Sequence, residues 1–512
     1  MANKLDMMSR DIVQENIKYI SERFPNALTE VKEDGELVKK IDFDVLKQEL
    51  SNAVISEKQE RYQMTWPDKK KSILLANTRI NGTLRPVKEK SVDFDNTKNL
   101  YIEGDNLDVL KLLRETYLAK VKMIYIDPPY NTGNDFVYED NFSQSSDEYL
   151  ASSGQYDEQG NRLFVNTDRN GRFHTDWLNM IYPRIKVAKD LLTEDGVIAI
   201  SMDDYEIDNL KKITDELFGE KNFLACVVWE RAYSPVNTKK HFSKSHDYIL
   251  FYAKNITYAV CNGLKRTDVA DKRYSNPDND PRGVWKSSDF SVGPRVDKNV
   301  YEIITPSGRS VFPPSGRCWR VTNKRYNDLL KDNRVWFGEN GGNVPSTKRF
   351  LTEVKQGMTP TTIWKYSEVG HTQEAAKQLK ELFDGVMIFD YSKPVNLIKR
   401  VIELYTGDND LILDFFSGSG TTAHAVLSIN SEFETTRKFI MVQIPEPCNE
   451  KSEPYKAGYK NICDIGEERI RRAGKKIKEE VAVPEESNLD IGFRVLKLDS
   501  SNMNDVFYNP NK

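Results

Sequence analysis

The sequence predicts an α/β fold built around a doubly wound, mostly parallel sheet, with a loop-rich insert and accessory regions at both ends. Three observations support this prediction. Strand and helix patterns alternate between residues 100 and 220, which is typical of βαβ units. A second strand, glycine loop and helix begin at Leu411. Between these segments, residues 256–385 contain short aromatic runs broken by Gly and Pro, which indicates a separate, loop-rich domain.

The pattern of apolar residues in the segment 100–252 predicts its helices and strands one after another. A strand over 100–103 enters a glycine turn, and Leu107, Leu110 and Leu113 follow at the spacing of one helical face. Short β-branched runs then alternate with amphipathic stretches. We therefore expect strands at 121–126, 197–201, 223–229 and 248–252, with an edge hairpin formed by the last two. We expect one helix that continues along the stripe Trp177–Leu192 and stops at Asp195-Gly196, and another at 206–218.

The predicted strand 121–126 stops at Asp127-Pro128-Pro129-Tyr130. Neither proline can donate a hydrogen bond to a sheet ladder, so the strand must end at Asp127. The turn then presents a carboxylate, a carbonyl and an aromatic ring at the carboxyl end of a strand. Open α/β sheets bind their ligands at such an edge.

These groups suit the activation of an exocyclic amino group on a base. Such a nitrogen is a poor nucleophile, because its lone pair is delocalised into the ring. Asp127 and the Pro128 carbonyl can accept its two N–H hydrogens and favour a pyramidal nitrogen that faces a methyl donor. Tyr130 can stack on a base that has been swung out of a duplex. For the tetrapeptide alone, an ordinary Pro-Pro turn after an Asp is an equal alternative.

Residues 411–422 combine a strand, a glycine loop and a helix start. Gly418 and Gly420 let the backbone approach a ligand, whose polar end can bind free N–H groups at the helix start. Dinucleotide binding is the rival interpretation. Against it, the third glycine of that fingerprint is absent, and the next strand, 438–443, ends in Gln443 instead of an acidic residue. If strands 121–126 and 411–415 are neighbours at the sheet's switch point, the two motifs form one cleft.

Two charged residues beside these motifs are further candidates. Asp105 follows the strand 100–103, where its carboxylate can meet a polar ligand atom or cap the next helix. Lys393 precedes the second segment and can pair with a ligand carboxylate, although a surface position is the commoner fate of a lysine.

The composition limits the classes of function. The length of 512 residues suggests about three domains. The net charge of −4 gives no overall preference for nucleic acid, so DNA binding requires basic residues gathered on one face. The five cysteines include no Cys-x-x-Cys pair, which indicates reduced thiols in a cytosolic protein without a zinc site. No apolar run reaches membrane length, so no membrane insertion is expected.

The loop-rich insert mixes basic and aromatic residues, which favours phosphate and groove contacts over a solvated surface with balancing acids. Near the carboxyl end we expect a helix at 464–480 with a basic cluster, and a last strand at 493–498. The segment 134–142 suits a lid, and 151–172 suits a mobile loop. The insert's candidate residues are Arg282, Lys286, Arg309, Arg317, Arg320, Lys324, Arg325, Lys348 and Arg349, among Trp285, Trp319, Tyr326 and Trp336.

The paired motifs resemble the β-group amino-DNA methyltransferases. In that group a catalytic motif like Asp127–Gly133 comes first, a target-recognition segment second and a cofactor loop like Asp414–Thr422 third, which is a circularly permuted order on a Rossmann-like sheet. Over roughly residues 60–500 the chain is similar to the modification (Mod) subunits of type III restriction–modification systems. The supporting residues are Gly104–Leu107, His174–Leu178, the run Asn276–Gly283 and Lys393-Pro394.

The resemblance implies a role for each region of the chain. It implies a catalytic half at 96–255, a target-recognition domain at 256–385 and a cofactor-binding half at 386–447. An N-terminal accessory region at 1–95 and a C-terminal region at 448–512 complete the division.

The resemblance also implies roles for individual residues. Asp127, Pro128, Pro129 and Tyr130 would form the catalytic motif that holds the adenine. Asp105 would meet the adenine end of S-adenosylmethionine, and Lys393 would lie near its methionine end. The remaining cofactor residues would be Asp127, Asp414, Phe416, Ser417, Gly418, Gly420, Thr422 and Gln443.

The implied activity is transfer of a methyl group from S-adenosylmethionine to N6 of adenine in double-stranded DNA, by a cytoplasmic homodimer that works with a helicase–nuclease restriction subunit. Three alternatives stay open. They are N4-cytosine methylation, methylation of RNA or of a protein glutamine amide, and a DNA-binding module that has lost catalysis.

Overall fold

The computed structural model describes residues 4–5, 12–23, 28–33, 36–43, 46, 64–132, 173–266, 271–354, 357–389, 391–480, 489–500 and 506–507. The predicted lid and the predicted mobile loop lie outside these residues. The chain forms two compact units, one of residues 1–261 with 361–512 and one of residues 262–360. The predicted five-region division remains a prediction.

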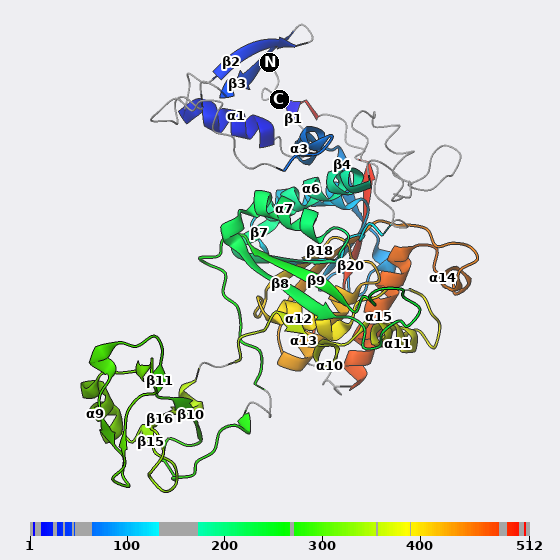
Figure 1. Ribbon diagram of the computed structural model, residues 1–512. Coiled ribbons are helices and arrows are strands. Elements are labelled where there is room, and N and C mark those ends of the chain that lie inside the picture. The colour runs from blue at the N-terminus through cyan, green and yellow to red at the C-terminus, as the bar shows by residue number, and fades with distance from the viewer. Residues whose placement is uncertain are drawn as a thin grey trace. The chain divides into compact units, whose positions relative to one another are not determined.

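The larger unit contains a ten-stranded mixed sheet (Figure 1). Its central strands are mostly apolar and almost entirely buried, as expected for parallel strands covered on both faces. In spatial order the strands are β17 (Ile363–Trp364), β8 (Phe223–Glu230), β9 (His246–Ala253), β7 (Leu192–Met202), β6 (Val121–Ile126), β18 (Leu411–Asp414), β19 (Lys438–Gln443), β5 (Leu100–Glu103), β20 (Arg494–Ser500) and β4 (Gly82–Pro86).

The predicted adjacency of the two motif strands is confirmed. β18 pairs in parallel with β6, with Ile412 opposite Met123 and Leu413 opposite Ile124. From β6 the chain continues to β7 on one side, and from β18 it continues to β19 on the other. The strand order therefore reverses between β6 and β18, which is the switch point where such sheets bind ligands.

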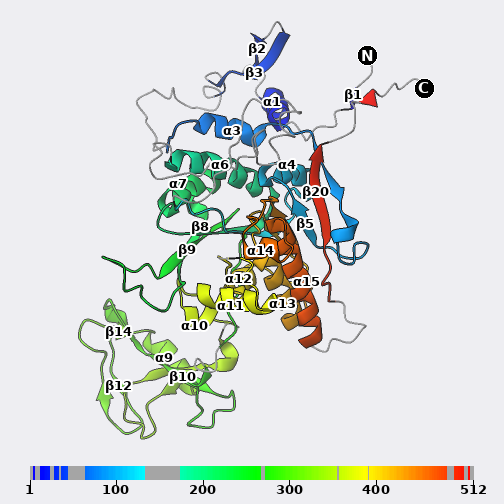
Figure 2. The same cartoon turned by 90° about the vertical axis from the view of Figure 1, so that its right-hand side faces the viewer.

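Helices cover both faces of the sheet. Figures 1 and 2 show α3, α4, α6 and α7 on one side and α12, α13 and α15 on the other. The predicted hairpin of β8 and β9 is present, but β17 lies outside it as the edge strand. The helices are α3 (Lys69–Asn77), α4 (Asn106–Tyr117), α6 (Phe173–Leu191), α7 (Ile207–Phe218), α10 (Tyr366–Val369), α11 (Thr372–Leu382), α12 (Val395–Glu403), α13 (Thr421–Phe433), α14 (Glu453–Lys456) and α15 (Ile462–Glu480).

The smaller unit, residues 262–360, has its own core of buried aromatic and aliphatic side chains, including Phe290, Trp319 and Tyr326. Its strands form a three-stranded sheet and two short ribbons. The elements are β10 (Trp285–Asp289), β16 (Ser346–Phe350) and β15 (Val335–Trp336), β11 (Ser291–Val292) with β14 (Cys318–Trp319), β12 (Ile303–Ile304) with β13 (Ser310–Val311), and α9 (Asn323–Lys331).

The ends of the chain add small elements to the larger unit. Among the described residues, no helix is long and apolar enough to cross a bilayer. The same residues contain no His, Cys, Asp and Glu cluster arranged to hold a metal ion. The elements are α1 (Ile12–Arg23), the hairpin β2 (Leu28–Glu33) with β3 (Glu36–Ile41), and β1 (Lys4–Leu5) paired with β21 (Val506–Phe507).

Candidate active site

The Asp-Pro-Pro-Tyr turn is held in place by α6. Trp177 is fully buried on this helix, and its indole N–H donates to the carbonyl of Pro129 at 2.8 Å. None of the described residues donates to the carbonyl of Pro128. The role of the Pro128 carbonyl as an acceptor for a ligand remains a prediction.

Asn131 fixes the direction in which the chain leaves the turn. It adopts a left-handed conformation with φ of 60° and is fully buried. Its amide donates to the carboxylate of Glu206 at 2.6 Å and to the carbonyl of Phe173 at 3.2 Å. Glu206 is itself fully buried and also contacts Nδ1 of His174 at 2.7 Å. An Asn in this strained backbone position is tolerated because its short polar side chain can bond locally.

Asp127 is bound by a lysine from the other half of the chain. The Nζ of Lys393 donates to Oδ1 at 2.7 Å and to Oδ2 at 2.6 Å. The same ammonium group lies 4.9 Å from the ring centroid of Tyr130. The sequence places Lys393 near the methionine end of the cofactor, and this placement remains a prediction. The structure adds that Lys393 neutralises the carboxylate of the catalytic motif.

Tyr130 presents a half-buried ring beside this ion pair. Its hydroxyl is enclosed and has no hydrogen-bond partner among the described residues. Burial raises the pKa of Tyr130 well above its usual value, and the negative charge of Asp127 raises it further. The side chain therefore acts as a neutral aromatic surface, which suits stacking against a base.

The glycine loop is shaped by Asp414, the last residue of β18. Its buried carboxylate accepts from the backbone N–H of Phe416 at 3.0 Å and from the Thr422 hydroxyl at 2.5 Å. Burial raises the pKa of Asp414 to about 7, an effect partly offset by these two hydrogen bonds. Both predicted cofactor residues, Asp414 and Thr422, thus use their polar atoms to hold the loop. Their contact with a cofactor remains a prediction.

Gly418 and Gly420 have φ values of 53° and 78°, a region that side chains disfavour. A Cβ atom at Gly420 would lie 3.1 Å from the carbonyl oxygen of Gly466 on α15. The backbone N–H of Gly418 donates to Oε1 of Gln443 at 2.6 Å. Gln443, which the sequence proposes for the cofactor, therefore tethers the loop to the end of β19.

Asp105 fulfils the capping role that was one of its two predicted functions. Its carboxylate accepts from the backbone N–H groups of Leu107 at 2.8 Å and Asp108 at 3.2 Å. It also pairs with the buried guanidinium of Arg184 at 3.1 Å. The neighbouring Asn106 donates to the carbonyl of Phe415 at 2.9 Å, which ties α4 to the glycine loop.

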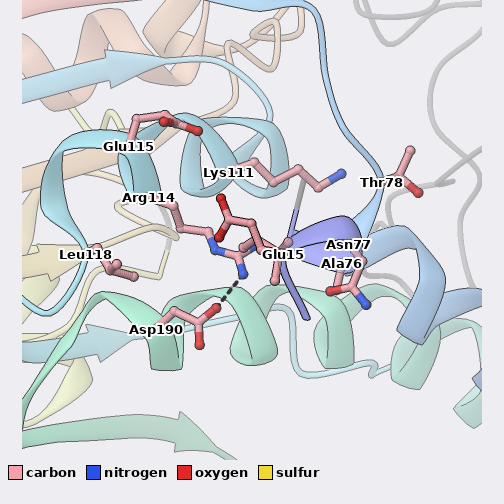
Figure 3. Close-up of a pocket in the computed structure, with 10 residues that line it drawn as sticks. Glu15, Ala76, Asn77, Thr78, Lys111, Arg114, Glu115, Leu118 and Asp190 are labelled. Atoms are coloured by element: carbon pink, nitrogen blue, oxygen red, sulfur yellow. Dashed lines mark hydrogen bonds and ion pairs between the residues drawn. The ribbon is translucent and has the colours of Figure 1, made fainter. Parts of the chain in front are cut away.

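The larger unit also contains a pocket of about 220 Å³ that none of the predicted site residues line. It is formed by α1, α3, α4 and α6, and Arg114 pairs with Asp190 at its wall, at 2.6 Å (Figure 3). Charges of both signs surround it, so no single ligand charge is favoured.

The sequence names Trp177 within the run His174–Leu178 but gives no signal for its contact with the turn. Glu206 starts the predicted helix 206–218, and nothing in the sequence indicates that its buried carboxylate binds Asn131. Arg469 belongs to the basic cluster that the sequence predicts on the helix 464–480, and the structure shows that its side chain is buried. Its position beside Ile470 and Ala473, on the apolar stripe of this helix, is the signal that could have shown its burial.

A buried acidic pair lies between α15 and β5. Lys90 Nζ contacts Glu103 at 2.6 Å and Glu467 at 3.6 Å. Burial raises the pKa of Glu467 to about 8, and the neighbouring Glu103 raises it too, while Lys90 opposes this shift.

We expect this cluster to make the protein less stable as pH rises from about 4.5, the ordinary value for Glu, towards about 8. In this window the folded state keeps a proton that the unfolded state has released, so the free energy of unfolding falls by up to about 1.4 kcal/mol per pH unit. Glu467→Gln should remove this slope and stabilise the protein at pH 8, as measured by urea unfolding across the window. Glu479→Gln, on the exposed face of the same helix, is the matched control. An unchanged slope in Glu467→Gln would refute the assignment.

The comparisons with known proteins agree with this geometry. The family described as DNA methylase, N6_N4_Mtase, matches residues 121–453. The Mod subunit of the type III restriction-modification enzyme StyLTI from Salmonella typhimurium is 35% identical over 470 residues, which are 90% of this chain and 70% of that protein. The chain is a type III Mod-subunit DNA methylase. The EcoP15I Mod subunit from Escherichia coli is 32% identical over 482 residues, 86% of this chain and 71% of that protein. Among solved structures, the cytosine-N4-specific PvuII DNA methyltransferase has a TM-score of 0.35 and 12% identity, and covers 74% of this chain and 93% of its own.

The family predicted from the two motifs is therefore confirmed. As a member, this Mod-subunit methylase is a site-specific DNA methyltransferase of a restriction–modification system and uses S-adenosylmethionine. The matched family covers both N6 and N4 methylation.

The residues present fit this cofactor. The hydroxyl of Ser417 is enclosed in the glycine loop without a partner among the described residues. Because Gly418 and Gly420 have no side chains, a ligand can approach the backbone at the start of α13. The free N–H groups at a helix start attract polar ligand atoms. Asp414 and Gln443 end the neighbouring parallel strands β18 and β19, and β18 also pairs with β6, the strand that precedes Asp127.

Proposed function

We propose that this Mod-subunit methylase transfers a methyl group to N6 of an adenine that is flipped out of double-stranded DNA. The observation that carries the proposal is the position of Asp127-Pro128-Pro129-Tyr130 at the end of β6, directly beside the glycine loop that follows β18. An acceptor pocket and a donor pocket that share one sheet edge can align the amine with the methyl carbon.

S-adenosylmethionine supplies an electrophilic methyl group on a sulfonium sulfur. The protein's part is to hold the amine. Asp127 and the Pro128 carbonyl accept its two hydrogens, so the nitrogen lone pair points out of the base plane. As the nitrogen–methyl bond forms, the nitrogen becomes positive, and the carboxylate of Asp127 stabilises that charge. The bond between the methyl carbon and sulfur would break in the same step, with its electron pair staying on sulfur, and one N–H proton would then pass to water, so that the amine returns to neutrality.

Lys393 must give up its two hydrogen bonds with Asp127 when the base enters. Before a base is bound, the ion pair with Lys393 offsets the cost of holding the negative charge of Asp127 in a half-buried position. On base entry, the ammonium can swing towards an anionic group while the amine takes its place. We propose that Lys393 holds the carboxylate of Asp127 in its orientation between turnovers.

The choice of adenine follows from the resemblance, because Asp as the first residue of the tetrapeptide is typical of adenine enzymes. A duplex of random sequence, incubated with the protein and labelled S-adenosylmethionine and then digested to nucleosides, tests this choice. Label in N6-methyladenosine is expected. Label in N4-methylcytosine, or transfer to RNA or a glutamine-containing peptide instead of duplex DNA, would reject the proposal in favour of one of the alternatives.

The loop between β8 and β9 is a candidate for binding the DNA backbone. β8 runs parallel to β7 and β6, so this loop leaves the sheet at the same edge as Asp127. Residues 231–245 contain an Arg and three Lys and no acidic residue. Phe242 is 93% exposed within it. Exposed cations and an aromatic side chain at the edge of a base-binding site match the chemistry of a nucleic-acid surface.

We expect the double substitution Lys239→Ala, Lys240→Ala to weaken DNA binding at low salt. For each phosphate that the variant no longer neutralises, the slope of log K against log salt concentration should become shallower by about 0.9. Binding titrations at several salt concentrations measure this slope. Lys475→Ala, Lys476→Ala, on the exposed face of α15, is the control that should leave it unchanged. Equal slopes for both variants would exclude the loop from the DNA interface.

The basic residues of the smaller unit support a role in target recognition. Six of the nine predicted basic residues are exposed, whereas Lys348 is buried. The predicted interleaving with aromatic residues is only partly an interface feature, because Trp285, Trp319 and Tyr326 belong to the core. The exposed set that we propose for phosphate binding is Arg309, Arg317, Arg320, Lys324, Arg325 and Arg349.

The relatives StyLTI and EcoP15I are modification subunits of type III enzymes. By analogy we propose that this chain acts on double-stranded DNA in the cytoplasm, forms a homodimer and assembles with a helicase–nuclease restriction subunit. Copurification with that subunit, with mass measurement of the complex, tests the assembly.

A further inference from the structure

A buried arginine lies behind the glycine loop and touches three hydroxyl groups. Arg469 is 2% exposed on α15. Its Nη1 donates to the hydroxyls of Ser392 at 2.9 Å, Ser419 at 2.7 Å and Thr421 at 2.7 Å. These three hydroxyls, which we call the hydroxyl triad, come from the segment before α12 and from the glycine loop.

Among the residues that the structure describes, no carboxylate balances the positive charge of Arg469. Among the described residues no ion pair includes Arg469, and its Nε has no hydrogen-bond partner. Burial lowers the pKa of Arg469 to about 9, so the guanidinium is still charged at neutral pH. A buried charge without a counter-ion is costly. An anionic ligand that settles nearby would recover part of this cost.

The hydroxyl triad adjoins two residues that are predicted to contact the cofactor, Lys393 and Gly420. The methyl carbon has to face Asp127, which Lys393 binds, and Ser392 is the residue before Lys393. The other two hydroxyls flank Gly420, at the start of α13.

The two N–H groups of Nη1 are shared among the three oxygens of the hydroxyl triad, so these oxygens act as acceptors towards Arg469. The Ser392 hydroxyl also lies 3.4 Å from the carbonyl of Lys393. The three oxygens lie 3.2 to 3.4 Å from one another, which is long for a bond between hydroxyls. These weakly held O–H groups can turn to donate to an anionic ligand. A charged donor behind them strengthens that donation.

We propose that Arg469 is a positioning residue that acts through the hydroxyl triad to bind the carboxylate of the methionine arm of S-adenosylmethionine. The guanidinium polarises the hydroxyls of the triad, and these hydroxyls bind the ligand, so Arg469 does not contact the ligand itself. Arg469 thereby favours a methyl donor that carries a carboxylate, and by fixing that carboxylate it orients the sulfonium group. This role depends on the established cofactor and is independent of which base is methylated.

Calorimetric titration without DNA tests the proposal with two ligands, S-adenosylmethionine and its decarboxylated analogue. Arg469→Met should weaken binding of S-adenosylmethionine by about 10- to 100-fold, the range for loss of a charged hydrogen-bonding partner. Binding of the decarboxylated analogue should change by less than about threefold, because it lacks the recognised group. Arg469→Lys should retain part of the preference.

Arg472→Met is the matched control, since Arg472 lies on the same helix but pairs with Asp384 and Glu468. It should leave both affinities unchanged. Thr421→Val removes one hydroxyl and keeps the side-chain shape, and should reduce the preference several-fold even if Arg469→Met does not fold. Equal losses of affinity for both ligands, or no loss for either, in the variants that fold would show that Arg469 only supports the loop and would overturn the proposal.

Discussion

Asp127→Ala should reduce methyl transfer by at least about 10²–10³-fold while DNA and S-adenosylmethionine bind within about threefold of the parent. The loss is large because the carboxylate accepts an amine hydrogen and stabilises the positive charge that develops on the nitrogen. Removing one such stabilising group from an active site commonly costs about 10²–10³-fold in rate. Binding is spared because the substitution leaves the glycine loop and the basic surface unchanged. Single-turnover transfer and two separate binding titrations measure the three quantities.

Two further variants sharpen this test. Asp127→Asn keeps one carbonyl acceptor but loses the charge, so its activity should lie between those of the parent and Asp127→Ala. Asp204→Ala removes a carboxylate that follows the neighbouring strand β7 and that pairs with Lys244, and it should keep near-parental activity. If Asp127→Ala transfers methyl groups within tenfold of the parent, the assigned role is wrong.

Lys348→Met should destabilise the smaller unit by about 3 kcal/mol, because breaking a buried ion pair costs several kcal/mol. Lys348 is fully buried and binds the carboxylates of Asp278 and Asp280, the latter at 3.3 Å. Arg282 holds Asp280 from the other side at 2.8 Å and lowers the pKa of that carboxyl far below its usual value. Without the ammonium group, two acidic side chains face each other with too little positive charge.

This destabilisation matters because a domain of about 100 residues is held by only 5–15 kcal/mol. Urea unfolding followed by tryptophan fluorescence reports it, since Trp285 donates to Asp278 at 2.9 Å within the same network. Lys286→Met, on the neighbouring half-buried position of β10, should cost less than about 1 kcal/mol. S-adenosylmethionine binding to the larger unit should be unchanged in both. Equal stability of Lys348→Met and the parent would mean that the network does not support the unit.

The strands of the site could be predicted from the sequence because each is a short β-branched run that ends abruptly. β5 and β19 have the predicted bounds, and the switch point follows from β-strand order alone. Helix ends were less accurate. The α6 helix continues through Pro183 and ends at Leu191, before the predicted stop at Asp195-Gly196, because β7 already begins at Leu192. Packing of its apolar face against the sheet and α4 outweighs the missing hydrogen bond.

The contacts that hold the site could not be predicted in this way. Lys393 and Asp127 are 266 positions apart, and no local pattern joins them. The tryptophans of the insert look the same in sequence whether they face DNA or a core, and only the packing of Phe290 and Tyr326 around Trp319 decides this. The burial of Arg469 and Lys348 is not predicted, because exposed Arg and Lys residues lie close to both in the sequence and residue type does not distinguish the buried ones from them.

The most direct test is a structure of this methylase with a duplex containing its target site and with sinefungin, a stable analogue of the cofactor. An adenine should lie outside the helix, stacked on Tyr130, with its amine bonded to Asp127 and the Pro128 carbonyl and with sinefungin over Gly418. A target base that stays paired within the duplex, or that enters a pocket away from β6, would contradict the proposed geometry.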